Sequence, residues 1–141
     1  MFFNSILAII PVHVELQEPL AEERLVEVFE DLLRGRTIEE FNRIVEANRL
    51  KVINVKKGHS VVFYLYCKTS KLWQELKKST ISGNLKVTIE KLCKRMDSQT
   101  KVVIRTIHIN AHVYENIDEY FAKKGWSYLC FAYLQLHIIN D

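Results

Sequence analysis

Glycine and proline are scarce in this chain, which has four glycines and two prolines among 141 residues. Loops that cradle phosphate need clustered glycines, because only a bare backbone lets several N–H groups approach the ligand. The four glycines stand singly at positions 35, 58, 83 and 125, and the sequence has neither a G-x-G-x-x-G run nor a G-K-[ST] loop. A standard nucleotide-binding motif is therefore excluded, and we expect no cofactor.

Cysteine is also infrequent, with three residues at positions 67, 93 and 130. The odd number and the absence of a C-x-x-C pair argue against a disulfide scaffold and against a zinc-binding motif. The chain also lacks an N-x-[ST] glycosylation signal. These absences predict a reducing environment, and hence a cytoplasmic location.

No arrangement of side chains typical of catalysis or metal binding is present. His108 and His112 have the four-residue spacing of metal ligands on a helix, but they straddle the end of an expected strand, where that geometry is lost. Glu22 and Glu23, like the carboxylates at 39–40, stand at the starts of expected helices and are explained by the helix dipole. We therefore predict a non-enzymatic protein with no catalytic and no metal-ligating residues.

Both ends of the chain are apolar. Residues 1–10 lack the basic flank of a signal peptide and fit a first strand or an apolar leader packed on the core. Residues 126–139 are apolar and aromatic, but this segment is shorter than the roughly 20 residues of a membrane-spanning helix. We predict that it forms a buried strand or a docking tail, that the chain has no membrane span, and that its apolar ends favour self-association.

Hydrophobic periodicity predicts a regular order of helices and strands. Strands show alternation of apolar residues, and helices show apolar stripes at three- and four-residue spacing. In the first helix this stripe comprises Leu25, Val28, Phe29, Leu32 and Leu33, and Gly35 ends it. The predicted strands cover 12–16, 50–55, 60–67 and 102–109, and the predicted helices cover 19–35, 37–48, 70–78, 84–96 and 113–124.

This order predicts one α/β domain over residues 1–141, an α+β sandwich of the ferredoxin-like type. Its four-stranded antiparallel sheet carries the helices on one face and leaves the other face available. Val62, Tyr64 and Tyr66 alternate away from the aliphatic side of their strand, and His13 lies between two valines of the first strand. Because tyrosine is enriched at protein interfaces, we predict that these four residues bind a partner. The alternative is that the apolar C-terminal segment 126–138 covers this face and buries the tyrosines.

The charge distribution keeps nucleic acid binding open as an alternative. Residues 36–110 hold sixteen basic and six acidic side chains, whereas both flanking regions are acidic. The run 57–64 also matches four positions of the ribonucleoprotein motif K/R-G-F/Y-G/A-F-V-x-F/Y, which stacks RNA bases on a ferredoxin-like sheet. Its two central aromatic positions, however, are His59 and Val61. Loss of these stacking platforms favours a protein partner over nucleic acid.

A longer pattern connects the second half of the chain to a known family. It comprises the strand 58–67, Leu72 and Trp73, the run 83–85 with the following apolar stripe, the strand 103–109 and Tyr114. Over residues 37–122 this pattern resembles the N-terminal domain of the TRADD-like family, which is named after the death-domain adaptor of the tumour-necrosis-factor receptor. The resemblance implies an α/β sandwich without enzymatic activity, an adaptor-like role in death or innate-immune signalling, and a TRAF-type protein partner.

Overall fold

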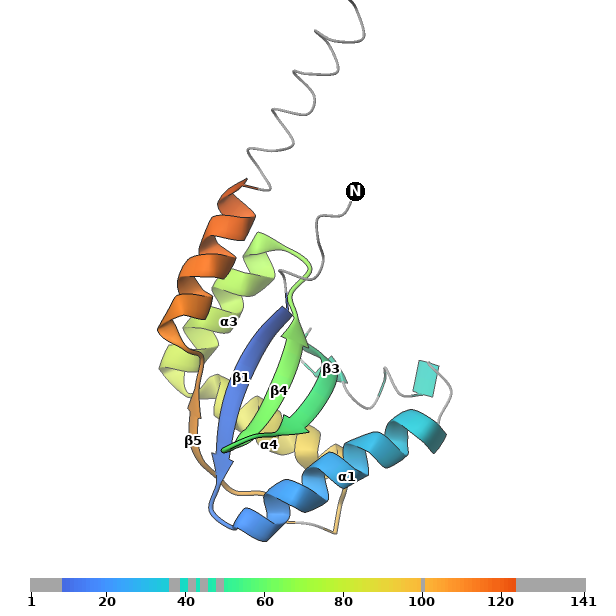
Figure 1. Ribbon diagram of the computed structural model, residues 1–141. Coiled ribbons are helices and arrows are strands. Elements are labelled where there is room, and N and C mark those ends of the chain that lie inside the picture. The colour runs from blue at the N-terminus through green and yellow to red at the C-terminus, as the bar shows by residue number, and fades with distance from the viewer. Residues whose placement is uncertain are drawn as a thin grey trace, which may run out of the picture.

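A computed structural model describes residues 9–35, 39–40, 43, 46–47, 50–99 and 101–123 (Figure 1). The elements in chain order are β1 (Ile9–Leu16), α1 (Pro19–Gly35), β2 (Glu46–Ala47), β3 (Leu50–Lys57), β4 (Val61–Tyr66), α3 (Ser70–Ser82), α4 (Asn84–Met96) and β5 (Ile104–His108). After β5, residues 111–123 are also helical. The apolar segment predicted over 126–139 lies outside the described residues.

The strands form a single sheet in the order β2-β3-β4-β1-β5, and each neighbouring pair is antiparallel. β4 lies between β1 and β3, so the crossover through α1 joins two strands that are not neighbours, as in a split β-α-β unit. The predicted mixed α/β fold with an antiparallel sheet is therefore confirmed. The short β2 is an addition to the four predicted strands.

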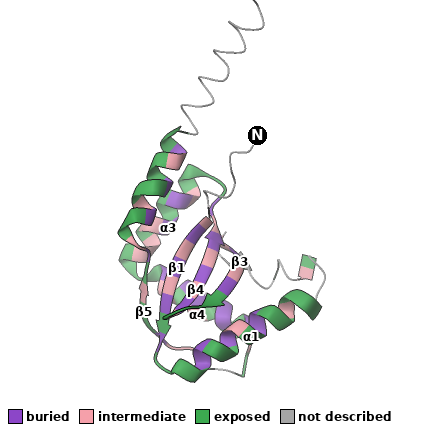
Figure 2. Ribbon diagram, viewed as in Figure 1, coloured by how far each residue is buried: buried purple, intermediate pink, exposed green. Residues whose placement is uncertain are grey.

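One face of the sheet and the facing helices form the core. Along β1, Ile10, Val12 and Val14 are fully buried and the residues between them are only partly buried, which Figure 2 shows as alternating colours. β4 alternates in the same way, with Phe63 buried. A fully buried aliphatic or aromatic side chain contributes about 1.5–3 kcal/mol relative to exposure. The alternation therefore fixes which face of the sheet the helices cover.

The corner between α3 and α4 follows from two local signals. Thr69 caps α3, because its side-chain oxygen accepts a hydrogen bond from the backbone N–H of Leu72 at 3.2 Å. Gly83 has φ +86°, a left-handed conformation that a side chain would strain, and it ends α3 directly before α4 begins. The break that the sequence predicted over 79–83 is thus confined to Gly83.

Two helix predictions need correction. Leu33, expected on the inner stripe of α1, is 55% exposed, because the buried stripe of this helix ends at Phe29. The helix predicted over 37–48 cannot extend to its expected end, because Glu46–Ala47 pair with β3 as a strand. The spacing of four apolar residues in that segment predicts an inward-facing stripe, and all four lie outside the described part: Ile38, Phe41, Ile44 and Val45. A separate prediction concerned the membrane: none of the helices in the described part of the chain has the length and apolar character of a membrane-spanning helix.

Helix α3 and the helical residues 111–123 lie side by side (Figure 1) and are joined by a polar cluster. Asp118 accepts a hydrogen bond from the indole N–H of Trp73 at 2.6 Å and from the ammonium of Lys77 at 2.7 Å. The hydrogen bond from Lys77 is the main reason why the pKa of Asp118 lies below its ordinary value, with a smaller contribution from Trp73. The charged form of Asp118 is therefore the one that makes the stronger contacts between these helices.

The Asp118→Asn variant tests this contribution through its pH dependence. A carboxyl whose pKa is depressed by folding stabilises the fold above its unfolded pKa and loses that contribution as the pH falls through the folded pKa. We expect the variant to be less stable than the parent near pH 7, and the difference to shrink below about pH 4. Urea unfolding at both pH values measures it, with the exposed Glu115→Gln as the matched control on the same helix. A difference that does not change with pH would contradict this role.

Candidate functional site

The described helices leave one face of the sheet uncovered, and we refer to it as the open face. The register of the strands places twelve side chains on it, and each is partly or fully exposed. They come from all four long strands, so the fold rather than any single segment creates this surface. The open face comprises Ile9, Pro11, His13, Glu15, Lys51, Asn54, Lys56, Val62, Tyr64, Tyr66, Thr106 and His108.

Two tyrosines of β4 occupy the centre of the open face. Tyr64 lies opposite Pro11 of β1 on one side and Asn54 of β3 on the other. Tyr66 lies opposite Ile9 in the next row. Each side chain is partly exposed, in contrast to the buried residues that alternate with them along β4. The centre of the face is therefore aromatic and apolar.

A histidine pair stands at the β5 side of the open face. His13 of β1 lies opposite His108 of β5 and, on its other side, opposite Val62. The two imidazole rings are stacked, with centroids 5.0 Å apart and planes 12° apart. The side-chain amide nitrogen of Asn110 lies 3.3 Å from Nε2 of His13. Burial, and then repulsion by the neighbouring His108, lower the pKa of His13, so its ring is neutral at neutral pH.

Charged side chains border the aromatic centre. On β3, Lys51 lies opposite Tyr66 and Lys56 lies opposite Val62. At the far end of β1, Glu15 pairs with Arg105 at 3.4 Å, and both side chains are largely exposed. An apolar aromatic centre with a polar and charged rim is the usual composition of a protein-binding patch.

The resemblance of residues 57–64 to the ribonucleoprotein motif is only partly retained in space. Lys57 does not lie on the open face, because its ammonium pairs with the buried carboxylate of Glu22 at 2.9 Å. Val62 and Tyr64 do lie on that face. The structure thus places Val62 and Tyr64 on the accessible surface, whereas Lys57 makes an ion pair within the fold.

Burial lowers the reactivity of the two described cysteines. Cys67 and Cys93 are both buried, and burial raises the pKa of each thiol to about 12. Both thiols are therefore protonated at neutral pH and poor nucleophiles. Among the described residues, no three or more histidine, cysteine, aspartate or glutamate side chains converge as a metal site.

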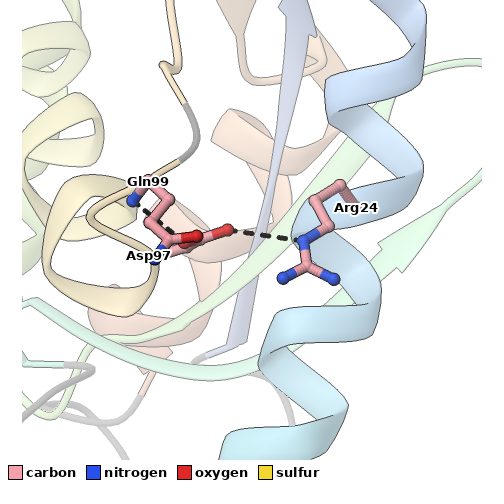
Figure 3. A network of polar contacts seen from close by, with 3 residues as sticks. All are labelled: Arg24, Asp97 and Gln99. Carbon is pink, nitrogen blue, oxygen red and sulfur yellow. Dashed lines mark hydrogen bonds and ion pairs between the residues drawn. The ribbon is translucent and has the colours of Figure 1, made fainter.

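An open cleft of about 430 Å³ separates α1 from the end of α4. In Figure 3, Asp97 binds Arg24 of α1 through one carboxylate oxygen at 3.4 Å and the backbone N–H of Gln99 through the other at 3.1 Å. These bonds connect the residues after α4 to α1, and Asp31, the other charged residue of the lining, pairs with Arg34 at 2.9 Å. Its lining is Arg24, Val28, Asp31, Leu32, Gly35, Met96 and Asp97.

Comparison of the chain with protein-family models, curated proteins and solved structures found no match. The resemblance to the TRADD-like family therefore stays a prediction. The structure brings all four predicted binding residues, His13, Val62, Tyr64 and Tyr66, to the open face. His108 lies beside them as well, although its spacing in the sequence relates it only to His112. Alternation within the two expected strands could assign each histidine to a face of its strand. Only the strand order shows that the two histidines contact each other.

Proposed function

We propose that this domain is a non-enzymatic protein-interaction module that binds its partner through the open face. The observation that carries the proposal is the position of Tyr64 and Tyr66, which are partly exposed at the centre of a sheet whose other face is the core. Tyrosine contributes a large, rigid contact area with a polar end, and such residues dominate the energy of many interfaces.

The surroundings of the tyrosines support the same proposal. Ile9, Pro11 and Val62 extend the apolar area, and Lys51 with Asn54 provides a polar border. The resemblance to the TRADD-like family suggests the finer proposal that the partner is of the TRAF type and that the module acts as a cytoplasmic signalling adaptor. No catalytic step is needed for such a role.

Nucleic acid is the second candidate partner, because Lys51 and Lys56 lie on the same face as the two tyrosines. Aromatic side chains beside lysines can stack bases while the ammonium groups contact phosphate, and stacking contributes about 1–3 kcal/mol per base. Binding of this kind weakens steeply with salt, because counterions are released from the phosphates. An aromatic protein interface depends much less on salt.

The Tyr64→Ala, Tyr66→Ala double variant tests the open face as the binding surface. Interface hot spots contribute about 2 kcal/mol or more, so we expect partner affinity to fall about thirtyfold. Capture of partners from cytosolic extract by the purified chain, with washes at low and high salt, identifies the partner class, and calorimetry with the identified partner gives the affinity. Tyr120→Ala, on the helical residues 111–123, is the matched control.

The outcomes separate the candidates. Proteins retained at high salt, and lost in the double variant but not in the Tyr120 control, support the protein-interaction proposal. Nucleic acid retained at low salt and released at high salt would favour the second candidate. Unchanged protein binding by a folded double variant would refute the open face as the site.

A further inference from the structure

We propose that His13 and His108 form a two-histidine binding site for a divalent transition-metal ion of the Ni²⁺, Cu²⁺ or Zn²⁺ type. The two residues are 95 positions apart in the sequence and directly opposite each other on β1 and β5. This inference concerns the histidine pair alone and does not depend on the protein-partner proposal.

The distance between the rings suits a shared ion. Each imidazole nitrogen binds zinc at about 2.0–2.1 Å, so two nitrogens on one ion lie about 3–4 Å apart. The ring centroids are 5.0 Å apart, and the rings are nearly parallel. Directly opposite residues of antiparallel strands have Cβ atoms about 4.5–5.5 Å apart, so a reorientation of both side chains can bring one nitrogen of His13 and one of His108 to the same ion. The paired backbones of two strands hold the residues at this separation.

The exposure of the pair and a neighbouring side chain favour metal binding. Imidazole is a suitable ligand for nickel, copper and zinc. His108 is exposed and His13 partly exposed, so an ion can reach both rings from solvent. Asn110 contacts Nε2 of His13, which leaves Nδ1 for the ion, and hydrogen bonds to the second nitrogen commonly orient histidine ligands.

The charges near the pair are balanced. On β1, Glu15 lies on the same face two residues after His13, and its carboxylate is paired with Arg105. On the other side, Lys56 is separated from His13 by Val62, two strand spacings or about 9–10 Å away. Two protein ligands leave the remaining coordination positions of the ion open to water, at the β5 side of the open face.

Titration of the full, untagged chain with NiCl₂ near pH 7.5 tests the site by calorimetry. Loss of an outer-shell partner commonly costs about 10–100-fold in metal affinity, so loss of either ligand in His13→Gln or His108→Gln should weaken binding at least about tenfold. Asn110→Ala, which removes a positioning residue, should weaken binding less than either. His59→Gln and His112→Gln, both on exposed histidines, are the matched controls.

A direct readout separates ligation from a structural effect. Paramagnetic Ni²⁺ should broaden the ring signals of His13 and His108 and the methyl signals of Val62, while those of His59 stay sharp. Circular dichroism confirms that each variant is folded. One ion per chain, lost in the His13→Gln, His108→Gln double variant, supports the site. Equal binding by the double variant and the parent, or loss of binding in a control instead, would overturn it.

Discussion

Replacing Trp73 by alanine is expected to lower the free energy of unfolding by about 3–5 kcal/mol, the usual cost of removing a large aromatic side chain from a core. Trp73 is fully buried on α3, and the ring of Tyr114 lies 5.6 Å from it. Its indole N–H donates to Asp118, and the ammonium of Lys77 lies 5.3 Å from its ring centroid. The substitution thus opens a cavity and also removes a contact between two helices.

Trp73→Phe separates these two effects. Phenylalanine keeps much of the apolar volume but has no N–H, so Asp118 loses one donor and keeps Lys77. A single hydrogen bond to a charged group contributes about 1.5–3 kcal/mol, and this variant should therefore lie between the parent and Trp73→Ala. Lys78→Ala, on the exposed side of α3, should change stability by less than about 0.5 kcal/mol.

Urea unfolding followed by circular dichroism measures all three variants. Small domains have a total stability of about 5–15 kcal/mol, so a loss of about 3–5 kcal/mol in Trp73→Ala can remove all of the stability of a domain at the lower end of that range. In that case Trp73→Phe keeps the test decisive, because its smaller loss is measurable. A Trp73→Phe variant as stable as the parent would show that the bond to Asp118 contributes nothing. A Trp73→Ala loss below about 1 kcal/mol would show that the site collapses without a cavity.

The elements of the fold were predictable from the sequence because periodicity is a local property. The alternation of Val61, Phe63 and Leu65 identified β4, and the stripe from Leu85 to Met96 identified α4. The inner face of each element follows directly from the same pattern. The pattern does not show at which residue a helix stops facing the sheet. Leu33 is exposed for this reason, although its spacing matches the apolar stripe of α1.

The candidate site was predictable only in part because its residues meet through strand order and register. Tyr64 and Tyr66 were assigned to one face from alternation within a single strand. The contact of His13 with His108 depends on β5 pairing with β1 rather than with another strand, and on the register between them. Neither follows from local pattern, because a one-residue shift of register moves each side chain to the opposite face.

Glu22 shows the same limit in the core, and it leads to the second large expected effect. As a carboxylate in the first turn of α1, it fits the helix dipole, which was the interpretation from sequence. In the structure it is only 4% exposed, and it accepts the backbone N–H of Leu16 at 3.0 Å while its other oxygen pairs with Lys57 at 2.9 Å. One side chain thus joins the end of β1, the start of α1 and the end of β3.

The Glu22→Ala variant should lose about 3 kcal/mol of unfolding free energy, because it leaves the Leu16 N–H and the Lys57 ammonium without their carboxylate. This lies at the lower end of the range for a broken buried pair, since the Lys57 side chain is 32% exposed and can regain water. Glu22→Gln should lose less, because its amide oxygen can still accept from Leu16. Urea unfolding at low and high salt measures each variant.

Glu23→Ala is the control that distinguishes the two explanations of Glu22. Glu23 is exposed in the same part of α1, so the helix dipole acts on both carboxylates, with about 0.3–1 kcal/mol for each. If the dipole were the main effect, the two alanine variants would lose similar stability and high salt would reduce both losses. If the contacts to Leu16 and Lys57 dominate, only Glu22→Ala shows a large loss, and salt changes it little. A double-mutant cycle with Lys57→Met then measures the coupling of the ion pair, separately from the bond to Leu16.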